Sequence, residues 1–171
     1  MHSLISIERV HSGSPKEVRE PYYFIFTFEG KASFTIDFTD YECNGRNLLF
    51  LSPYQFLQWR MVPSPVDQIQ FHGDFYCIEY HKKEVACNGI LFNNIYQQPY
   101  VPVSKQLFGE IGNILGKMRQ LDLRDQENAP VLRSYLQLVL ALSSREKQQK
   151  GSTGVEDSRL DGIVNFQSVL E

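Results

Sequence analysis

In the first hundred residues, apolar residues come in short runs that are separated by turn-forming residues. Residues 22–28 are rich in Tyr and Phe, and residues 32–38 alternate between apolar and smaller or polar side chains. Such alternation is typical of half-buried strands. Gly30, between these runs, and Asn44-Gly45 further along are turn signals, because both residue types tolerate positive φ. Strands spaced about ten residues apart, with glycine and proline between them, predict a sandwich or a barrel.

The period of the apolar positions changes beyond Gly89. Residues 104–121 carry apolar side chains at every third or fourth position, and residues 130–147 repeat this pattern more strongly. Both segments predict helices, the first with Ser104 as its N-cap. The sequence is therefore mainly β with a helical tail: a β-barrel followed by two or three α-helices.

The change of period near residue 100 separates two parts of one predicted domain, residues 1–147. The barrel takes about residues 1–100, and the helices take about residues 104–147. Residues 148–154 are polar and predict a flexible linker, after which residues 160–170 start a further amphipathic helix. Because this helix is still apolar at its end, we expect residues 148–171 to lead into a domain that this chain lacks.

The charge and the cysteine content exclude several classes of function. The formal net charge is −3, and no cluster of Lys and Arg precedes the tail, so the chain as given is not expected to bind DNA. The cysteines Cys43, Cys77 and Cys87 are odd in number and lack CxxC spacing, which argues against a disulfide framework or a zinc site. We find no signal peptide and no segment that could span a membrane. These features predict a cytoplasmic protein with reduced thiols and no membrane partner.

Catalytic and metal-binding patterns are weak. A metal site in a small β-barrel usually needs two His one residue apart on a strand, together with a carboxylate. The four histidines are His2, His11, His72 and His81, and none forms a His-x-His pair. No Gly-x-Ser-x-Gly motif or phosphate-binding loop is present either. We therefore predict no metal, no cofactor and no catalytic residues.

Polar and aromatic residues on the barrel strands are candidates for a small-molecule site, since such sites are mostly apolar with a few polar groups. Trp59-Arg60 and His72 stand out because their polar tips could orient a ligand. The alternative is that these aromatic residues simply fill the barrel. The candidate ligand-binding residues are Tyr23, Trp59, Arg60, His72 and Tyr80.

The predicted helix over residues 130–147 is apolar on more than one face, so one face can pack on the barrel while another needs a partner. Val131, Leu138 and Leu140 lie on the second face. We predict a homodimer with two such helices paired about a two-fold axis, and the alternative is complete burial within one subunit. The predicted interface residues are Leu132, Tyr135, Leu136, Val139 and Leu142.

The order of these features resembles the N-terminal domain of AraC-type transcription regulators. The features are Gly30 after the first hairpin strand, LFLSP at residues 49–53, GDFYCIEY at residues 73–80 and LFN at residues 91–93 before the paired helices. VNFQSVLE at residues 164–171 resembles the helix that leads into that family's helix-turn-helix half. The likeness extends over nearly the whole chain.

The resemblance implies a cupin-like barrel, or double-stranded β-helix, that senses a small-molecule effector, together with helices that form a homodimer. DNA would be bound only through a C-terminal domain that is absent from this chain. Ligand contacts vary within the family, so no ligand-binding residue is carried over. The alternatives are a free-standing cupin enzyme, such as a metal-dependent isomerase or dioxygenase, and a dimeric small-molecule-binding protein without a DNA partner.

Overall fold

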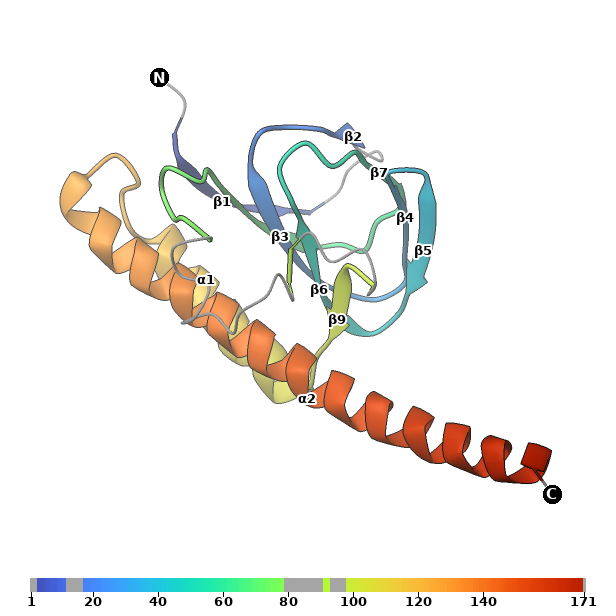
Figure 1. The fold of residues 1–171 in the computed structure, drawn as a ribbon. Coiled ribbons are helices and arrows are strands. Elements are labelled where there is room, and N and C mark those ends of the chain that lie inside the picture. Colours follow the sequence, from blue (N-terminus) through green and yellow to red (C-terminus); the bar gives the residue numbers. More distant parts are fainter. Residues whose placement is uncertain (1–2, 12–16, 79–90, 93–97, 171) are drawn as a thin grey trace.

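The fold is known from a computed structural model that describes residues 3–11, 17–78, 91–92 and 98–170, with side chains up to residue 150. Within these residues, nine strands precede two α-helices and one short 3-10 helix (Figure 1). The strands are β1 (Ile5–Val10), β2 (Glu17–Val18), β3 (Tyr23–Glu29), β4 (Ala32–Ile36), β5 (Thr39–Cys43), β6 (Arg46–Leu51), β7 (Leu57–Met61), β8 (Val66–Phe71) and β9 (Tyr100–Pro102).

The strands form two antiparallel sheets that face each other. The five-stranded sheet has the order β1-β8-β3-β6-β9, and the four-stranded sheet has the order β2-β7-β4-β5. From β5 to β8 the chain changes sheet at every connection, which is the winding of a double-stranded β-helix. The structure confirms the predicted class: a cupin-like, mainly β fold followed by two helices.

Two hydrophobic cores lie on opposite faces of the five-stranded sheet. The barrel core fills the space between the sheets, and the helix core lies between the five-stranded sheet and the helices. The central strands β3 and β6 are buried on both faces and read as nearly continuous apolar runs, whereas β1 and β8 alternate between apolar and polar residues. The barrel core comprises Phe24, Phe26, Phe28, Ala32, Phe34, Ile36, Leu49, Leu51, Leu57, Trp59 and Val66.

The predicted strand over residues 32–38 ends earlier than its apolar alternation suggests. β4 stops at Ile36, and Asp37 and Phe38 form a turn with φ of 46° and 72°. Asp37 fixes this turn, because its N–H donates to the Phe56 carbonyl (3.0 Å) and its Oδ1 accepts from the Phe56 N–H (2.9 Å). Phe38 is consequently 95% exposed instead of joining the barrel core.

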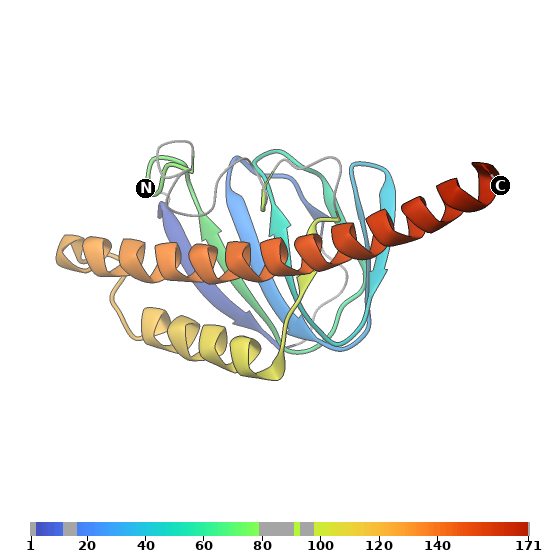
Figure 2. The same cartoon turned by 60° about the horizontal axis from the view of Figure 1, so that its bottom comes forward.

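The helices cover the outer face of the five-stranded sheet, as Figure 2 shows. They are α1 (Lys105–Arg119) and α2 (Ala129–Leu170), joined through the 3-10 helix Gln126–Asn128. Ser104 caps α1 as predicted, since its Oγ accepts from the Leu107 N–H (3.1 Å). None of the helices in the described part of the chain is long and apolar enough to cross a membrane.

The predicted linker at residues 148–154 is not a break in the structure. α2 continues without interruption to Leu170, so the further helix expected from residue 160 is its continuation. Gly151 and Gly154 each cost a helix about 1 kcal/mol relative to alanine, which weakens it but does not stop it. Figures 1 and 2 show this part of α2 projecting beyond the barrel. The domain boundary near residue 147 stays a prediction.

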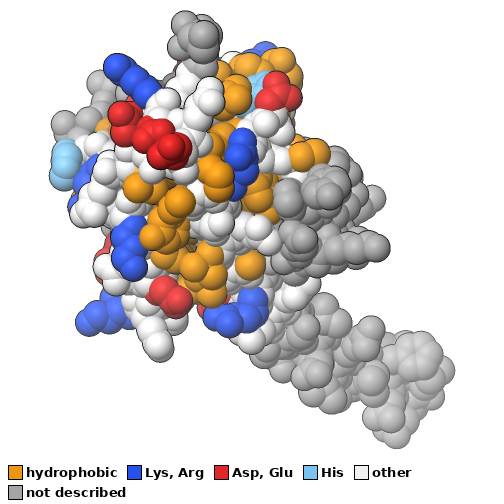
Figure 3. All heavy atoms as spheres, turned by 90° about the vertical axis from the view of Figure 1, so that its left-hand side faces the viewer, with side chains coloured by type: hydrophobic (Ala, Val, Ile, Leu, Met, Phe, Trp, Pro, Cys, Tyr) orange, Lys and Arg blue, Asp and Glu red, His pale blue; other side chains and the backbone are white. Residues whose placement is uncertain are grey.

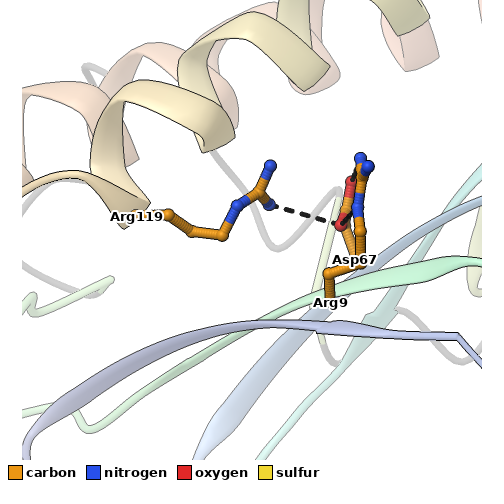
Figure 4. A network of polar contacts seen from close by, with 3 residues as sticks. All are labelled: Arg9, Asp67 and Arg119. Carbon is orange, nitrogen blue, oxygen red and sulfur yellow. Dashed lines mark hydrogen bonds and ion pairs between the residues drawn. The ribbon is translucent and has the colours of Figure 1, made fainter.

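A charged network joins the five-stranded sheet to α1 (Figure 4). Arg9 on β1 makes two hydrogen bonds to the Asp67 carboxylate on β8, of 2.8 and 3.0 Å, and Arg119 at the end of α1 approaches it to 3.3 Å. The Asp67 side chain is 8% exposed. Because a buried carboxylate needs charged or polar partners, this network favours one position of α1 on the sheet.

Candidate functional site

The residues predicted to bind a ligand are not brought together. Trp59, on β7 of the four-stranded sheet, lies in the barrel core. Tyr23, on β3 of the five-stranded sheet, packs instead against the helix core, stacked on Phe71 with ring centroids 5.1 Å apart. Arg60 points outward from the four-stranded sheet and pairs with Asp40 at 3.3 Å. The four candidates that the structure describes are Tyr23, Trp59, Arg60 and His72. They do not form one pocket.

His72 follows β8 and is bound locally. Its Nδ1 accepts a hydrogen bond from the Asp74 backbone N–H (3.0 Å) and lies 3.3 Å from the Asp74 carboxylate. Its ring meets Tyr22 edge-on at 5.5 Å. Tyr80 lies outside the described residues.

The barrel interior is filled by its own aromatic side chains. Trp59 stands at the centre, with edge-to-face contacts to Phe26 (5.5 Å), Phe28 (5.8 Å) and Phe34 (5.3 Å). All members of the barrel core are almost completely buried. A ligand in this region would have to displace close-packed rings, at the cost of breaking favourable contacts. The alternative interpretation of the barrel aromatics, that they form the core, therefore applies to Trp59.

A hollow of about 400 Å³ opens at one end of the barrel, beside the four-stranded sheet. It lies where β4 begins and where β5 and β7 end. Its lining combines a cation, an anion and uncharged polar groups with apolar surface. The lining residues are Lys31, Ala32, Ser33, Glu42, Cys43, Asn44 and Met61.

Two glycine turns form the rim of the hollow. Gly30 and Gly45 have φ of 127° and 83°, a region that favours glycine, as their positions in the sequence predict. The Gly30 N–H donates to the Gly45 carbonyl (2.9 Å), so the β3–β4 and β5–β6 turns lie side by side. The Asn44 Oδ1 accepts from the Gly45 N–H (2.8 Å), and the backbone carbonyl of Asn44 accepts from the Asn47 side-chain amide (3.0 Å). The hollow thus has a rim fixed by backbone hydrogen bonds.

The chemistry of the hollow suits binding better than catalysis. Burial raises the pKa of Cys43 to about 11, so its thiol stays protonated at neutral pH and is a poor nucleophile. Lys31 and Glu42 are exposed and can contact a charged ligand. Among the described residues, no group of three or more His, Cys, Asp or Glu side chains could hold a metal ion.

Tyr100 on β9 connects the hollow to the rest of the domain. Its hydroxyl donates to the backbone carbonyl of Glu42 (3.2 Å), and its ring meets Phe34 and Tyr41 edge-on at 6.2 and 6.4 Å. Burial, followed by the proximity of Cys43 and Tyr41, raises the pKa of Tyr100. The hydroxyl therefore remains a hydrogen-bond donor at neutral pH.

Most of the predicted dimer residues face the interior of the chain. Leu132, Leu136, Val139 and Leu142 belong to the helix core, and Tyr135 packs against its edge. Buried side chains of this kind cannot contact a second copy, so they do not form an interface in this arrangement. Of the residues predicted on the second face of α2, Val131 and Leu138 are each 43% exposed, whereas Leu140 is fully buried in the helix core. Figure 3, which views the side on which α2 begins, shows hydrophobic side chains gathered among charged ones.

Comparison with known proteins agrees with this fold. No family model matches the sequence, and no curated protein matches it significantly. CuxR, an AraC-like transcriptional activator, is similar in structure, with a TM-score of 0.50 over 81% of this chain and 52% of its own, at 13% identity. An apo ToxT variant from Vibrio cholerae strain SCE256 has a TM-score of 0.50 over 82% of this chain and 54% of its own, at 9% identity. This chain thus matches about half the length of each.

At these identities the likeness establishes the fold. As a likeness of fold, the similarity to CuxR and ToxT confirms the predicted resemblance to the cupin-like domain of AraC-type regulators. The hollow was missed by sequence reasoning, because its lining residues are common surface types. The available signal was the pair of glycine turns at Gly30 and Gly45, which join β3 to β4 and β5 to β6 at the same end of the barrel. The hairpin expected at Gly30 is wrong, because β3 and β4 lie in different sheets.

Proposed function

We propose that this chain is the effector-sensing and dimerising half of a cytoplasmic AraC-type transcription regulator. A small molecule binds beside the barrel, in the hollow lined by Lys31, Glu42 and Met61, and not among the packed rings of the barrel core. DNA is bound by a further domain, which follows the end of α2. In this proposal the chain has no catalytic activity of its own.

The observation that carries the proposal is the contrast between a filled barrel and an open hollow at its end. Among the described residues, the space around Trp59 is occupied by the rings of Phe26 and Phe34, whereas the hollow offers about 400 Å³. This volume is in the range of small-molecule sites. The fold shared with an AraC-like activator supports a regulatory role.

A thermal-shift screen tests the ligand site. The probes are amino acids, simple sugars and small carboxylic acids, because the hollow presents both charges and neutral polar groups. We expect a binding compound to raise the melting temperature of the wild-type chain. The gain should disappear in Met61→Trp, which fills the hollow, and persist in Tyr54→Trp, a change at an exposed position outside its lining. Equal stabilisation of both variants would contradict the proposed site.

The proposed homodimer uses the outer face of α2. Val131 and Leu138 are seven residues apart and so lie on one side of the helix, with the half-buried Tyr135 between them. Two such helices placed antiparallel about a two-fold axis would cover these side chains. Light scattering on the purified chain would then report a dimer.

The enzyme alternative is separated from this proposal by metal analysis of the purified protein. Cupin enzymes of the isomerase and dioxygenase type depend on a bound metal ion, whereas the regulatory proposal requires none. Stoichiometric iron, manganese or zinc that survives dialysis would contradict the regulatory proposal and favour the enzyme.

A further inference from the structure

Strand β9 lies between the hollow and the C-terminal part of α2. It is only three residues long, and it pairs with β6 at the edge of the five-stranded sheet. Its side chains divide between the two cores: Tyr100 packs against the barrel core, and Val101 belongs to the helix core. β9 therefore touches both sides of the sheet.

On the side of the hollow, β9 is held through Tyr100. The hydroxyl of Tyr100 donates to the backbone carbonyl of Glu42 at 3.2 Å. Glu42 is one of the residues that line the hollow. Its ring contacts Phe34 and Tyr41. A molecule that displaces the chain at Glu42 or Cys43 therefore acts directly on the position of Tyr100.

On the side of the helices, β9 is held by two lysines of α2. The Lys147 ammonium donates to the carbonyl of Gln98 (3.2 Å), and the Lys150 ammonium donates to the carbonyl of Pro102. Lys150 also pairs with Glu146 one turn earlier on the helix, at 3.5 Å. The two lysines thus hold the segment just before β9 and the last residue of β9, at the place where α2 begins to leave the barrel.

We propose that β9 couples occupancy of the hollow to the position of the C-terminal part of α2, through Tyr100 at one end and Lys147 and Lys150 at the other. This inference rests on the proposed function, because it specifies how the effector site would act on the helix that leads to the DNA-binding half. A ligand shifts the equilibrium to the extent that it favours one position of β9 over another.

The burial of Lys147 makes its bond to Gln98 sensitive to small displacements. Lys147 is only 8% exposed, and burial lowers its pKa to about 8. At neutral pH it is charged in a poorly hydrated position, where loss of a hydrogen bond to a charged group is costly. A shift of β9 that breaks this bond therefore favours a compensating movement of α2.

Hydrogen exchange on the full chain tests the coupling from the side of the hollow. Tyr100→Phe removes the bond to Glu42 and keeps the ring, and Tyr41→Phe is the control because its ring lies in the same cluster. We expect Tyr100→Phe to raise amide exchange at residues 141–150 of α2 at least about threefold, and Tyr41→Phe to leave it unchanged. Exchange in α2 that is identical in Tyr100→Phe and the wild type would overturn the proposal.

A reciprocal test starts from the helix, since coupling between two sites acts equally in both directions. Cys43 lines the hollow, so its rate of alkylation by iodoacetamide, in a Cys77→Ser, Cys87→Ser background, reports on the hollow. The rate is measured at alkaline pH, where part of the Cys43 thiol is ionised. We expect Lys147→Met, and the more exposed Lys150→Met, to change this rate at least about threefold. Lys117→Met, an exposed lysine on α1, is the control.

An unchanged Cys43 rate in both α2 variants, with far-UV circular dichroism like that of the wild type, would contradict the coupling. Neither test requires the effector. Failure of the coupling would therefore leave the ligand site untouched, and failure of the ligand screen would leave the coupling untouched.

Discussion

The two sheets of the barrel differ in what covers their outer faces. The five-stranded sheet has the helix core packed against it, and the outward residues Leu48, Phe50 and Ile69 are almost completely buried. In the described part of the chain no helix covers the four-stranded sheet, and its outward residues include the exposed ion pair of Arg60 and Asp40. Both sheets contribute side chains to the barrel core between them.

This difference suggests that the five-stranded sheet mainly stabilises the domain, whereas the four-stranded sheet can carry the binding site. A sheet buried on both faces forms a rigid support for α1 and α2, and changes there disturb the whole domain. The four-stranded sheet needs only its inner face for folding, so its ends and turns are free to carry a binding site. The hollow lies on that side of the molecule. The same contrast holds along α2, where one face is core and the other is surface.

The largest expected effect comes from the two faces of α2. Leu136→Glu places a charge in the helix core, where Leu136 is fully buried, and we expect it to abolish cooperative folding. Leu138→Glu changes a residue that is 43% exposed, and we expect a folded chain that has lost the dimer. Circular dichroism and light scattering distinguish these outcomes. A folded Leu138→Glu chain that is still dimeric would show that the interface lies elsewhere.

The second prediction compares outward residues of the two sheets. Phe50→Ala leaves a cavity under the helices and should lower the free energy of unfolding by about 3–5 kcal/mol. Gln58→Ala, on the outer side of β7, should change it by no more than about 0.5 kcal/mol. Urea denaturation measures both. Similar costs for the two variants would mean that the outer face of the four-stranded sheet is also part of the stable core.

The third prediction compares charged pairs on the two sheets. Asp67→Asn weakens the network with Arg9 and Arg119 and should cost about 1–3 kcal/mol, because the carboxylate is buried. Arg60→Gln weakens an exposed pair with Asp40 and leaves the hydrogen bond from Thr35 to Asp40 in place, so it should cost no more than about 0.5 kcal/mol. The same denaturation experiment applies. If Asp67→Asn is as mild as Arg60→Gln, the network does not hold α1 to the sheet.

The smallest effect concerns pH. Burial lowers the pKa of Lys147 from 10.5 to about 8, so between these values the unfolded chain binds more protons than the folded chain. Stability conferred through Lys147 should therefore rise with pH across this window. Between pH 7 and pH 10, the free energy of unfolding of the wild type should rise by about 1–2 kcal/mol relative to that of Lys147→Met. This range allows for partial screening of the Lys147 charge by solvent. A difference between the two chains that does not vary with pH would show that Lys147 is well hydrated in the folded state.

The elements of the fold could be predicted because local signals agreed with the final structure. The glycines at 30 and 45 adopt positive φ in turns that connect one sheet to the other, and Ser104 caps α1. Phe38 is an exception. Its place in an alternating run predicts an inward side chain, but the hydrogen bonds between Asp37 and Phe56 turn the chain before it. Such a contact between distant residues has no local signature.

The site was harder to predict, because periodicity indicates which face a residue lies on but not what covers that face. Trp59 was correctly placed on a strand, yet whether the space around it is empty depends on the volumes of all its neighbours. Both apolar faces of α2 were visible in the sequence, but the pattern alone did not determine that Leu136 packs on the sheet and Leu138 remains exposed. The continuity of α2 through its polar segment depends on helix propagation, which composition only weakly opposes.

The central claim, that recognition takes place at the open end of the barrel and not inside it, is tested most directly by NMR. The measurement is a chemical-shift map of the chain with the most stabilising compound from the thermal-shift screen. The account predicts that the largest shifts occur at Ala32, Cys43 and Met61, which line the hollow. Largest shifts at Trp59 and Phe26, with no change at the hollow, would contradict it.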